Sequence, residues 1–316
     1  MVRVRGTLSR GSNGETASGA AGPLLSPTRA PVQKMTSLTM APKPRLNFLS
    51  AARMSRFPPF PERFGRWAVI AGASEGLGAA FAEALAARGL NLVLLARRLA
   101  LLDMLAADLR AKHRVEVRAV ACDLSDVSFA EALSETCAEL DVGVAVYNAA
   151  FSLVAPLLDR PREEALRVVD VNVRGPVLFS HAVLPAMVAR GRGALVLMSS
   201  LAGFQGTPKL AAYAASKAFN TVFAESPWAE LRPKGVDVLA SCAGAIRTPG
   251  FAKALKKDAP GTLDAADVVA RTLDAIGRGP VVIPGWINVL ANFFLRRLVT
   301  RRTAVNVMER SMAGLQ

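Results

Sequence analysis

The chain has few residues of the kinds that bind metals or form disulfide bonds. Its 316 residues include only three cysteines and two histidines. Cys122, Cys137 and Cys242 lack the close spacing of a zinc site, so we expect no metal. Their odd number, without a secretory signal, indicates reduced thiols in a reducing compartment. His113 and His181 lie far apart without matching neighbours, so neither is a candidate catalytic residue.

Acidic residues are scarce at both ends of the chain. The net charge of +14 comes mainly from residues 1–66, with eleven Lys or Arg against two acids, and from residues 287–316, with five Arg against one Glu. Residues 1–62 are rich in Ser, Pro, Gly and Arg and lack apolar periodicity, which predicts a disordered basic extension. No groove-reading motif accompanies the charge, so we expect no nucleic-acid partner.

The same N-terminal segment lacks the long apolar core of a secretory signal. Its Arg- and Ser-rich, acid-poor composition resembles an organelle transit segment, while Met35, Met40 and Met54 are alternative start positions. We therefore expect a cytoplasmic protein, with an organelle or a membrane surface as the alternative location.

A glycine-rich turn follows the apolar run at residues 67–71 and precedes a helical pattern at residues 79–88. In this order, glycines let the backbone approach a pyrophosphate, and the free N–H groups of the helix attract it. The segment is therefore a candidate dinucleotide site, and its candidate cofactor-binding residues are Gly72, Ser74, Glu75, Gly76, Leu77 and Gly78.

No acidic residue stands at the end of the second apolar run, residues 90–96, where an NAD enzyme would place one against the ribose 2′-hydroxyl. Arg97 and Arg98 stand there instead. Two cations suit a 2′-phosphate, which predicts NADP(H) as the cofactor. Two arginines that only solvate a loop are the alternative.

Tyr213 and Lys217 lie four residues apart, so a helix would place both side chains on one face. A free tyrosine titrates near ~10, and catalysis near neutral pH needs a shift of roughly 3 units, which a nearby ammonium group can provide. Ser200 lies thirteen residues upstream. The pattern makes Tyr213 a candidate general acid or base, although such a pair alone is also common on exposed helices.

Apolar strands and amphipathic helices alternate between residues 67 and 284, which predicts an α/β fold with one doubly wound parallel sheet. Pro227 is expected to interrupt the helix predicted from about residue 210 to 232. We expect three parts, residues 1–62, 63–285 and 286–316. The predicted strands lie near residues 67–72, 90–96, 115–121, 142–148, 193–199, 236–242 and 280–284.

Across residues 66–285, these ordered motifs resemble the classical short-chain dehydrogenase/reductase family. The resemblance implies a Rossmann-type fold and a catalytic tetrad at Asn172, Ser200, Tyr213 and Lys217. In this family Tyr213 would exchange a proton with the substrate oxygen and Ser200 would hydrogen-bond that oxygen. Lys217 would bind the nicotinamide ribose and lower the pKa of Tyr213, and Asn172 would hold a water for proton relay.

Other cofactor-binding positions follow from the same resemblance. Asp123, before Leu124, matches the acid that accepts from the adenine amino group, with a helix cap as the alternative. The family's Asn-Ala-Gly stretch reads Asn148, Ala149 and Ala150 here, so a methyl group stands where the family has glycine. A positive φ at that position would make the methyl group costly. Thr248 matches the threonine that contacts the nicotinamide carboxamide or the pyrophosphate.

The residues around the expected substrate site are mostly apolar, which favours a lipophilic ketone or alcohol. They include Phe151, Leu153, Val154, Leu157, Phe204, Leu210 and Phe251. The chain loosely resembles the branch of the 3-ketoacyl-CoA reductases and 17β-hydroxysteroid dehydrogenases, which implies 3-oxoacyl or steroid-like substrates. We expect an NADP(H)-dependent oxidoreductase that forms a homo-oligomer, a dimer or a tetramer. A non-catalytic NADP(H)-binding sensor or partner subunit is the alternative.

The C-terminal segment, residues 286–316, begins with an apolar run and continues with clustered arginines. The run is too short to span a bilayer. Three interpretations remain open: a helix packed on the protein, a lid over the substrate, and a helix in contact with an anionic membrane surface.

Overall fold

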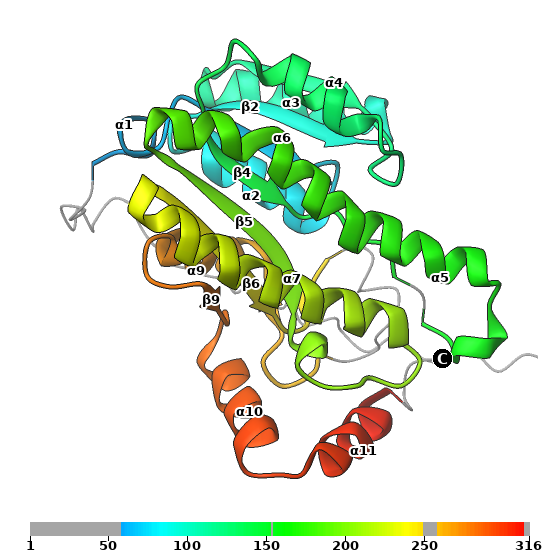
Figure 1. Cartoon of the computed structure of the whole chain (residues 1–316). Coiled ribbons are helices and arrows are strands. Elements are labelled where there is room, and N and C mark those ends of the chain that lie inside the picture. The colour runs from blue at the N-terminus through cyan, green and yellow to red at the C-terminus, as the bar shows by residue number, and fades with distance from the viewer. Residues whose placement is uncertain (1–57, 153, 249–257, 313–316) are drawn as a thin grey trace, which may run out of the picture. The chain divides into compact units, whose positions relative to one another are not determined.

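A single parallel sheet of seven strands forms the centre of the molecule (Figure 1). The computed structural model describes residues 58–152, 154–248 and 258–312. All of them belong to one compact unit, Met54–Gln316. In spatial order the strands are β3 (Val117–Ala121), β2 (Asn91–Ala96), β1 (Trp67–Ala71), β4 (Val142–Tyr147), β5 (Gly193–Ser200), β6 (Val236–Ala243) and β9 (Val281–Val282).

Helices cover both faces of this sheet, because alternate residues of a strand point to opposite faces. Ala68 and Ile70 of β1 belong to one apolar cluster, whereas Val69 and Ala71 belong to the other. Both clusters are buried, so the predicted doubly wound fold is confirmed. The first cluster contains residues of α2 (Gly76–Ala86), α3 (Leu99–His113) and α9 (Ala265–Ala275), and the second contains residues of α4 (Phe129–Cys137), α6 (Gly175–Arg190) and α7 (Ala211–Leu231).

The strand order changes direction beside β1. From β1 the chain continues outward to β2 and β3, and it then returns to the other side of β1 to form β4. The connections after β1 and β4 therefore leave the sheet in opposite directions. In open α/β sheets such a switch creates a crevice at the carboxyl ends of the strands, where ligands bind.

The longest helix, α7, is continuous through Pro227. The predicted interruption at this residue is therefore wrong. An internal proline loses one backbone hydrogen bond and typically costs about 3 kcal/mol or more. Here the helix packs against β5 and β6 and buries Ala224 completely, so tertiary packing maintains the helix across the proline.

Two helices follow β9, α10 (Trp286–Arg297) and α11 (Arg301–Met312) (Figure 1, orange to red). They lie within the predicted C-terminal part, whose boundary at residue 285 stays a prediction, as does the boundary at residue 62. Most of the predicted basic extension lies outside the described residues. The shorter elements are α1 (Phe60–Arg63), η1 (Leu157–Asp159), α5 (Arg162–Val169), η2 (Asp170–Arg174), η3 (Leu201–Phe204), η4 (Arg232–Lys234), β7 (Ile246–Arg247) and β8 (Leu263–Asp264).

Candidate active site

The glycine turn between β1 and α2 is packed so closely that side chains do not fit at two of its positions. Gly72 has φ of +81°, and a Cβ atom there would lie 2.7 Å from the backbone N of Ala149. A Cβ atom at Gly78 would lie 1.9 Å from the carbonyl oxygen of Gly72. The Asn148 Nδ2 donates to the same oxygen at 2.9 Å, which fixes the turn against the loop after β4.

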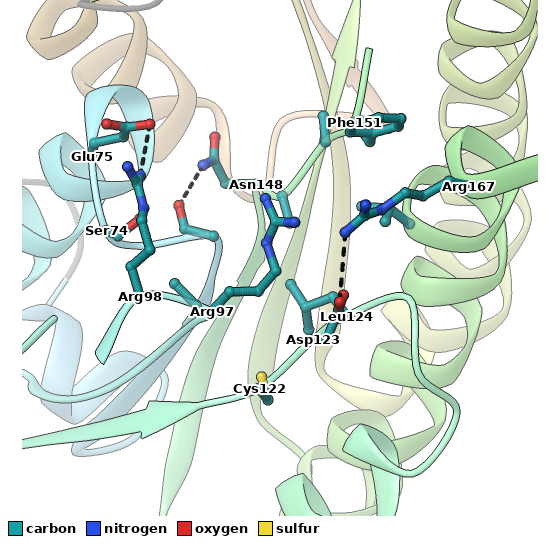
Figure 2. Close-up of a pocket in the computed structure, with 15 residues that line it drawn as sticks. Ser74, Glu75, Arg97, Arg98, Cys122, Asp123, Leu124, Asn148, Phe151 and Arg167 are labelled. Carbon is teal, nitrogen blue, oxygen red and sulfur yellow. Dashed lines mark hydrogen bonds and ion pairs between the residues drawn. The ribbon is translucent and has the colours of Figure 1, made fainter. Parts of the chain in front are cut away.

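A cavity of about 290 Å³ opens beside this turn, at the carboxyl ends of the first four strands (Figure 2). It is the kind of concave site that small ligands occupy. Most of the predicted cofactor-binding residues line it, and Cys122, Arg167 and Val171 line it without having been predicted. The full lining is Gly72, Ser74, Glu75, Ala96, Arg97, Arg98, Cys122, Asp123, Leu124, Asn148, Ala149, Ala150, Phe151, Arg167 and Val171.

Three other predicted residues surround the turn without lining this cavity. Leu77 is the second residue of α2, and its side chain is buried in the first apolar cluster. Gly76 has φ of +57°, and a Cβ atom there would lie 3.4 Å from the Cγ2 of Thr248. Thr248 therefore lies close to the glycine turn although it is 170 residues downstream.

Two arginines follow β2, and they have different surroundings. Arg98 forms an ion pair with Glu75 at 2.8 Å and donates to the Ser74 Oγ at 3.2 Å. Arg97 extends into the cavity, where Arg167 of α5 reaches toward it from the opposite side (Figure 2). Within the described part of the chain, no ion pair or hydrogen bond engages the Arg97 guanidinium. Arg97 is thus the more available cation for an anionic ligand.

Arg167 had no signal in the sequence, because it lies on a helix far from the cofactor motifs. Its Nη2 is 3.6 Å from the Asp123 Oδ2, and its guanidinium lies 5.1 Å from the centre of the Phe151 ring. The sequence of α5 has the pattern of an ordinary amphipathic helix and contains no binding motif. Only the packing of this helix beside the loop after β3 brings Arg167 to the cavity.

Asp123 is an ionised hydrogen-bond acceptor at the cavity wall. Its Oδ1 accepts from the Ser125 N at 3.0 Å and the Ser125 Oγ at 2.7 Å. Partial burial acts to raise its pKa, but the hydrogen bonds from Ser125 and the charges of Arg167 and Arg97 lower the pKa below its usual value. The Oδ2 atom remains directed toward Arg167.

Ala150 occupies the position where the resembling family has glycine. The positive-φ residues other than glycine in the described chain are Arg114 and Lys209, so Ala150 has an ordinary backbone conformation. The methyl group lines the cavity without the backbone strain that a positive φ would impose.

Ser200 and Tyr213 meet where β5 ends and α7 begins. Ser200 is the last residue of β5, and Tyr213 lies in the first turn of α7. Burial raises the pKa of Tyr213, while a side-chain hydrogen bond with Ser200 acts to lower it. The net pKa is raised, so the phenol is protonated at neutral pH.

Lys217 lies one turn further along α7 and is buried. Its Nζ donates to the carbonyl oxygen of Met198 at 2.8 Å and lies 5.6 Å from the centre of the Tyr213 ring. Burial lowers the pKa of Lys217 to about 8. At the Tyr213 phenol burial outweighs the hydrogen bond with Ser200, and the lowering of its pKa by Lys217 that the family resemblance implied stays a prediction.

Asn172 lies in a π-helical turn, η2, between α5 and α6. Such turns interrupt a helix locally and are frequent at functional sites. Its buried Oδ1 accepts from the Phe151 N at 2.8 Å, and its Nδ2 donates to the Phe151 O at 2.9 Å and the Ser216 Oγ at 3.1 Å. Asn172 therefore joins the loop after β4 to the residue beside Lys217, and its role in holding a water stays a prediction.

The predicted substrate-contacting residues divide into separate groups. Leu157 and Leu210 line a second cavity, of about 30 Å³, that reaches Tyr213. The Phe204 ring is instead stacked under the Arg296 guanidinium of α10, at 4.7 Å. Leu153 and Phe251 lie outside the described residues.

Comparisons with known proteins agree with this arrangement. The family model for short chain dehydrogenases matches residues 66–259. A very-long-chain 3-oxoacyl-CoA reductase of Phaeosphaeria nodorum is 30% identical over 256 residues, which cover 77% of this chain and 74% of that protein. The reductase of the same name from Podospora anserina is 41% identical over 180 residues, or 55% of this chain and 53% of that protein.

One similar protein has a name that points away from catalysis. A human protein named inactive hydroxysteroid dehydrogenase-like protein 1 is 34% identical over 201 residues, which cover 61% of this chain and 59% of that protein. Here and in the Podospora reductase, the chain matches little more than half of the curated relative.

Three solved structures show the same fold. A 7β-hydroxysteroid dehydrogenase is 29% identical with a TM-score of 0.76, over 79% of this chain and 99% of that chain. A short-chain dehydrogenase from Sphingobium yanoikuyae in complex with NADPH is 29% identical with a TM-score of 0.65, over 78% and 94%. A 3-oxoacyl-[acyl-carrier protein] reductase with bound NAD from Brucella melitensis is 28% identical with a TM-score of 0.62, over 73% and 96%.

The family model thus matches most of this chain. The matched region contains the glycine turn, the cavity beside it, and the serine, tyrosine and lysine at β5 and α7. The chain belongs to the short-chain dehydrogenase family of oxidoreductases, which use a nicotinamide cofactor, near the 3-oxoacyl-CoA reductases and hydroxysteroid dehydrogenases.

Proposed function

We propose that this protein is an NADP(H)-dependent oxidoreductase that interconverts a lipophilic ketone and a secondary alcohol. The observation that carries the proposal is the position of Ser200, Tyr213 and Lys217 at the carboxyl end of β5 and the start of α7. They lie in the same fold as a glycine turn and an arginine-lined cavity. A proton donor and a dinucleotide site are the two parts that such a reaction requires.

The residues around the cavity fit a phosphorylated dinucleotide. Gly72 and Gly78 leave room for backbone only, and the N-cap residue of α2, Glu75, makes no side-chain cap hydrogen bond, so the helix N-terminus is open to an anion. Asp123 would accept from the adenine amino group, and Arg97 and Arg98 would hold the 2′-phosphate. When bound, the reduced cofactor supplies a hydride to the carbonyl carbon.

The chain's own residues would handle the proton. Because its pKa is raised, the Tyr213 phenol is in the form that donates to a carbonyl oxygen during reduction. Ser200 would orient that oxygen by a hydrogen bond. Lys217, with a pKa of about 8, is mostly protonated at pH 7, so it would bring a positive charge to the site and help to return a proton to Tyr213.

Apolar side chains near Tyr213 support a lipophilic substrate, although Arg160 and Lys209 line the same small cavity. Leu157 and Leu210 line the small cavity that reaches Tyr213, and Leu158 beside them is 92% exposed. Apolar walls favour a lipophilic substrate. The names of the relatives, 3-oxoacyl-CoA reductase and hydroxysteroid dehydrogenase, support 3-oxoacyl or steroid-like ketones.

The direct test is oxidation of NADPH in the presence of long-chain 3-oxoacyl thioesters, ketosteroids and aromatic ketones. We expect Tyr213→Phe to abolish turnover and to retain NADPH binding, since the ring remains and only the proton is lost. The chain contains one other tyrosine, Tyr147, whose hydroxyl donates to the Val171 O at 2.6 Å. Tyr147→Phe is the matched control, which should lower stability but leave the folded enzyme active. Full activity of Tyr213→Phe would refute the assignment.

Cofactor preference is tested separately. Arg97→Ala should weaken NADPH binding by roughly 1–3 kcal/mol, because it removes a charge-assisted hydrogen bond to the 2′-phosphate, and it should leave NADH binding nearly unchanged. Arg118→Ala is the control, since Arg118 lies on β3 and pairs with Glu116 outside the cavity. Equal losses for both cofactors in Arg97→Ala would contradict the proposed 2′-phosphate site.

A non-catalytic NADP(H)-binding protein is the second candidate. The human relative with the word inactive in its name favours it. This candidate predicts saturable NADPH binding, measured by nicotinamide fluorescence, with no oxidation of NADPH by any ketone of the panel. Turnover that disappears in Tyr213→Phe would exclude it.

A further inference from the structure

Helix α10 exposes its apolar side to solvent. Trp286 is 74% exposed, Leu290 59%, Phe293 54% and Phe294 52%. These four apolar residues lie on one side of the helix and form a continuous strip, and Arg297 follows them on the same side. Ile287, Val289 and Leu298 extend the strip and are also exposed. We call these seven apolar residues the α10 face.

The side of α10 opposite this face contacts the protein through Asn288, the one buried residue of the helix, and Leu295 on the same side is partly buried. Asn288 is only 4% exposed, and its Nδ2 donates to the Pro284 O at 2.8 Å and the Gly261 O at 3.1 Å. Gly244 and Gly261 make room for it, because a Cβ atom at either would lie within 2.9 Å of the Asn288 amide. The amide therefore fixes the helix with the α10 face outward.

Two arginines attach α10 and α11 to the rest of the protein. The Arg296 guanidinium stacks on the Phe204 ring, and the Arg301 Nη1 donates to the Phe204 O at 3.2 Å. Both contacts are with η3, the turn that directly follows Ser200. In Figure 1, α10 and α11 lie beyond the end of β5, apart from the helices that cover the sheet. The α10 face is thus held in place and is left uncovered by the described residues.

The charges of α10 and α11 are mostly positive. Residues 286–312 contain five arginines and a single acid, Glu309. Arg297 and Arg302 are exposed, and no ion pair or hydrogen bond is found for them within the ranges that the structure describes. A second copy of this face would bring its own arginines against these, and the repulsion would oppose association. An anionic surface matches the charges and covers the apolar strip.

We propose that α10 and α11 bind the surface of an anionic lipid bilayer, with the α10 face in the interfacial layer and Arg297 and Arg302 among the lipid phosphates. Tryptophan and phenylalanine beside arginine are the composition of helices that lie in this layer. None of the helices in the described ranges is long and apolar enough to cross a membrane. The contact is therefore peripheral, and it is independent of the proposed oxidoreductase activity.

Trp286 is a reporter for this contact. Of the three tryptophans, Trp67 is 7% exposed, Trp228 is partly buried beneath the Arg232 guanidinium, and Trp286 is 74% exposed. On titration with vesicles of phosphatidylcholine and phosphatidylglycerol, we expect the emission to shift to shorter wavelength and to be quenched by brominated acyl chains. Trp286→Phe keeps the strip apolar and should remove the shift. A shift that persists in Trp286→Phe would overturn the proposal, because the signal would come from another part of the chain.

Sedimentation with the same vesicles tests the face itself. The full-length Leu290→Asp/Phe293→Asp variant should bind at least about tenfold more weakly than the wild type, and Arg297→Ala/Arg302→Ala should lose affinity and salt dependence. The control is Leu99→Asp/Met104→Asp, which changes exposed apolar residues of α3, 44% and 70% exposed, and should bind like the wild type. Residues 1–57 also carry nine Lys or Arg against one acid, so they are a second candidate for attraction to anionic vesicles. Comparison with the control shows whether binding depends on the α10 face or on this segment.

Three results would overturn the proposal. The first is a wild-type protein that does not sediment with anionic vesicles, and the second is equal binding by the α10 variant and the α3 control. The third is a change of oligomeric state in the α10 variant by sedimentation velocity without lipid, which would assign the face to a second copy of the chain. Far-ultraviolet circular dichroism and a thermal unfolding midpoint like those of the wild type show that the fold of each variant is intact.

Discussion

Burial of Lys217 is expected to destabilise the folded protein in a pH-dependent way, and replacing this residue should remove that pH dependence. The buried ammonium group has a pKa of about 8, against 10.5 for an unperturbed lysine. Each pKa unit corresponds to about 1.4 kcal/mol, so the protonated lysine destabilises the folded state by about 3 kcal/mol when both states are protonated. Lys217→Met removes the charge and keeps most of the side-chain volume.

The sign follows from proton binding. Between the folded pKa of about 8 and the unfolded value of 10.5, the unfolded chain binds more protons at Lys217, so the stability of the wild type rises with pH there. Over pH 7 to 10, the wild type should gain about 2.5 kcal/mol relative to Lys217→Met. Cysteines and tyrosines titrate in the same range, but those remote from Lys217 are unchanged between the two proteins and cancel in the difference. Cys242 interacts with Lys217, so Cys242→Ala is introduced into both proteins.

The assay is urea unfolding of both proteins at pH 7, 8.5 and 10, followed by circular dichroism. At pH 7 the variant loses the hydrogen bond to Met198 and leaves that carbonyl unpaired, which costs roughly 1–3 kcal/mol and offsets part of the gain. The pH dependence of the difference is therefore the decisive quantity. A difference that stays constant from pH 7 to 10 would refute the assigned burial cost. We also expect turnover to disappear in this variant.

Three further substitutions test the site. Gly78→Ala should destabilise the protein by more than about 2 kcal/mol and prevent cofactor binding, since its Cβ atom would overlap the Gly72 carbonyl oxygen; unchanged thermal unfolding and NADPH binding would contradict this. Asn172→Leu should lower stability by about 3 kcal/mol, because both backbone groups of Phe151 lose their partners, and a melting temperature like that of the wild type would show that they pair elsewhere. Ala150→Gly should destabilise slightly, by roughly 0.4–1 kcal/mol, because φ is not positive there; a gain in stability would indicate strain at Ala150.

The fold was largely predictable because its signals are local. Continuous apolar runs form buried parallel strands, and each predicted strand lies within a few residues of its observed position. The last predicted strand, residues 280–284, is reduced to Val281–Val282 at the sheet edge. The interruption predicted at Pro227 failed because the local cost of a proline was outweighed by packing of α7 on the sheet, which no local pattern contains.

The sequence by itself identified the candidate residues for the chemistry: the glycines of the turn, the arginines after β2, and Tyr213 with Lys217 one helical turn away. Their spacing is short, so local geometry is sufficient to group them. Only the tertiary structure decided that Arg167 faces Arg97 across the cavity, that Lys217 is directed to the Met198 carbonyl, and that α10 turns its apolar side to solvent. These features depend on contacts between residues far apart in the chain, and on the burial those contacts create, which sets both the pKa values and the exposed surface.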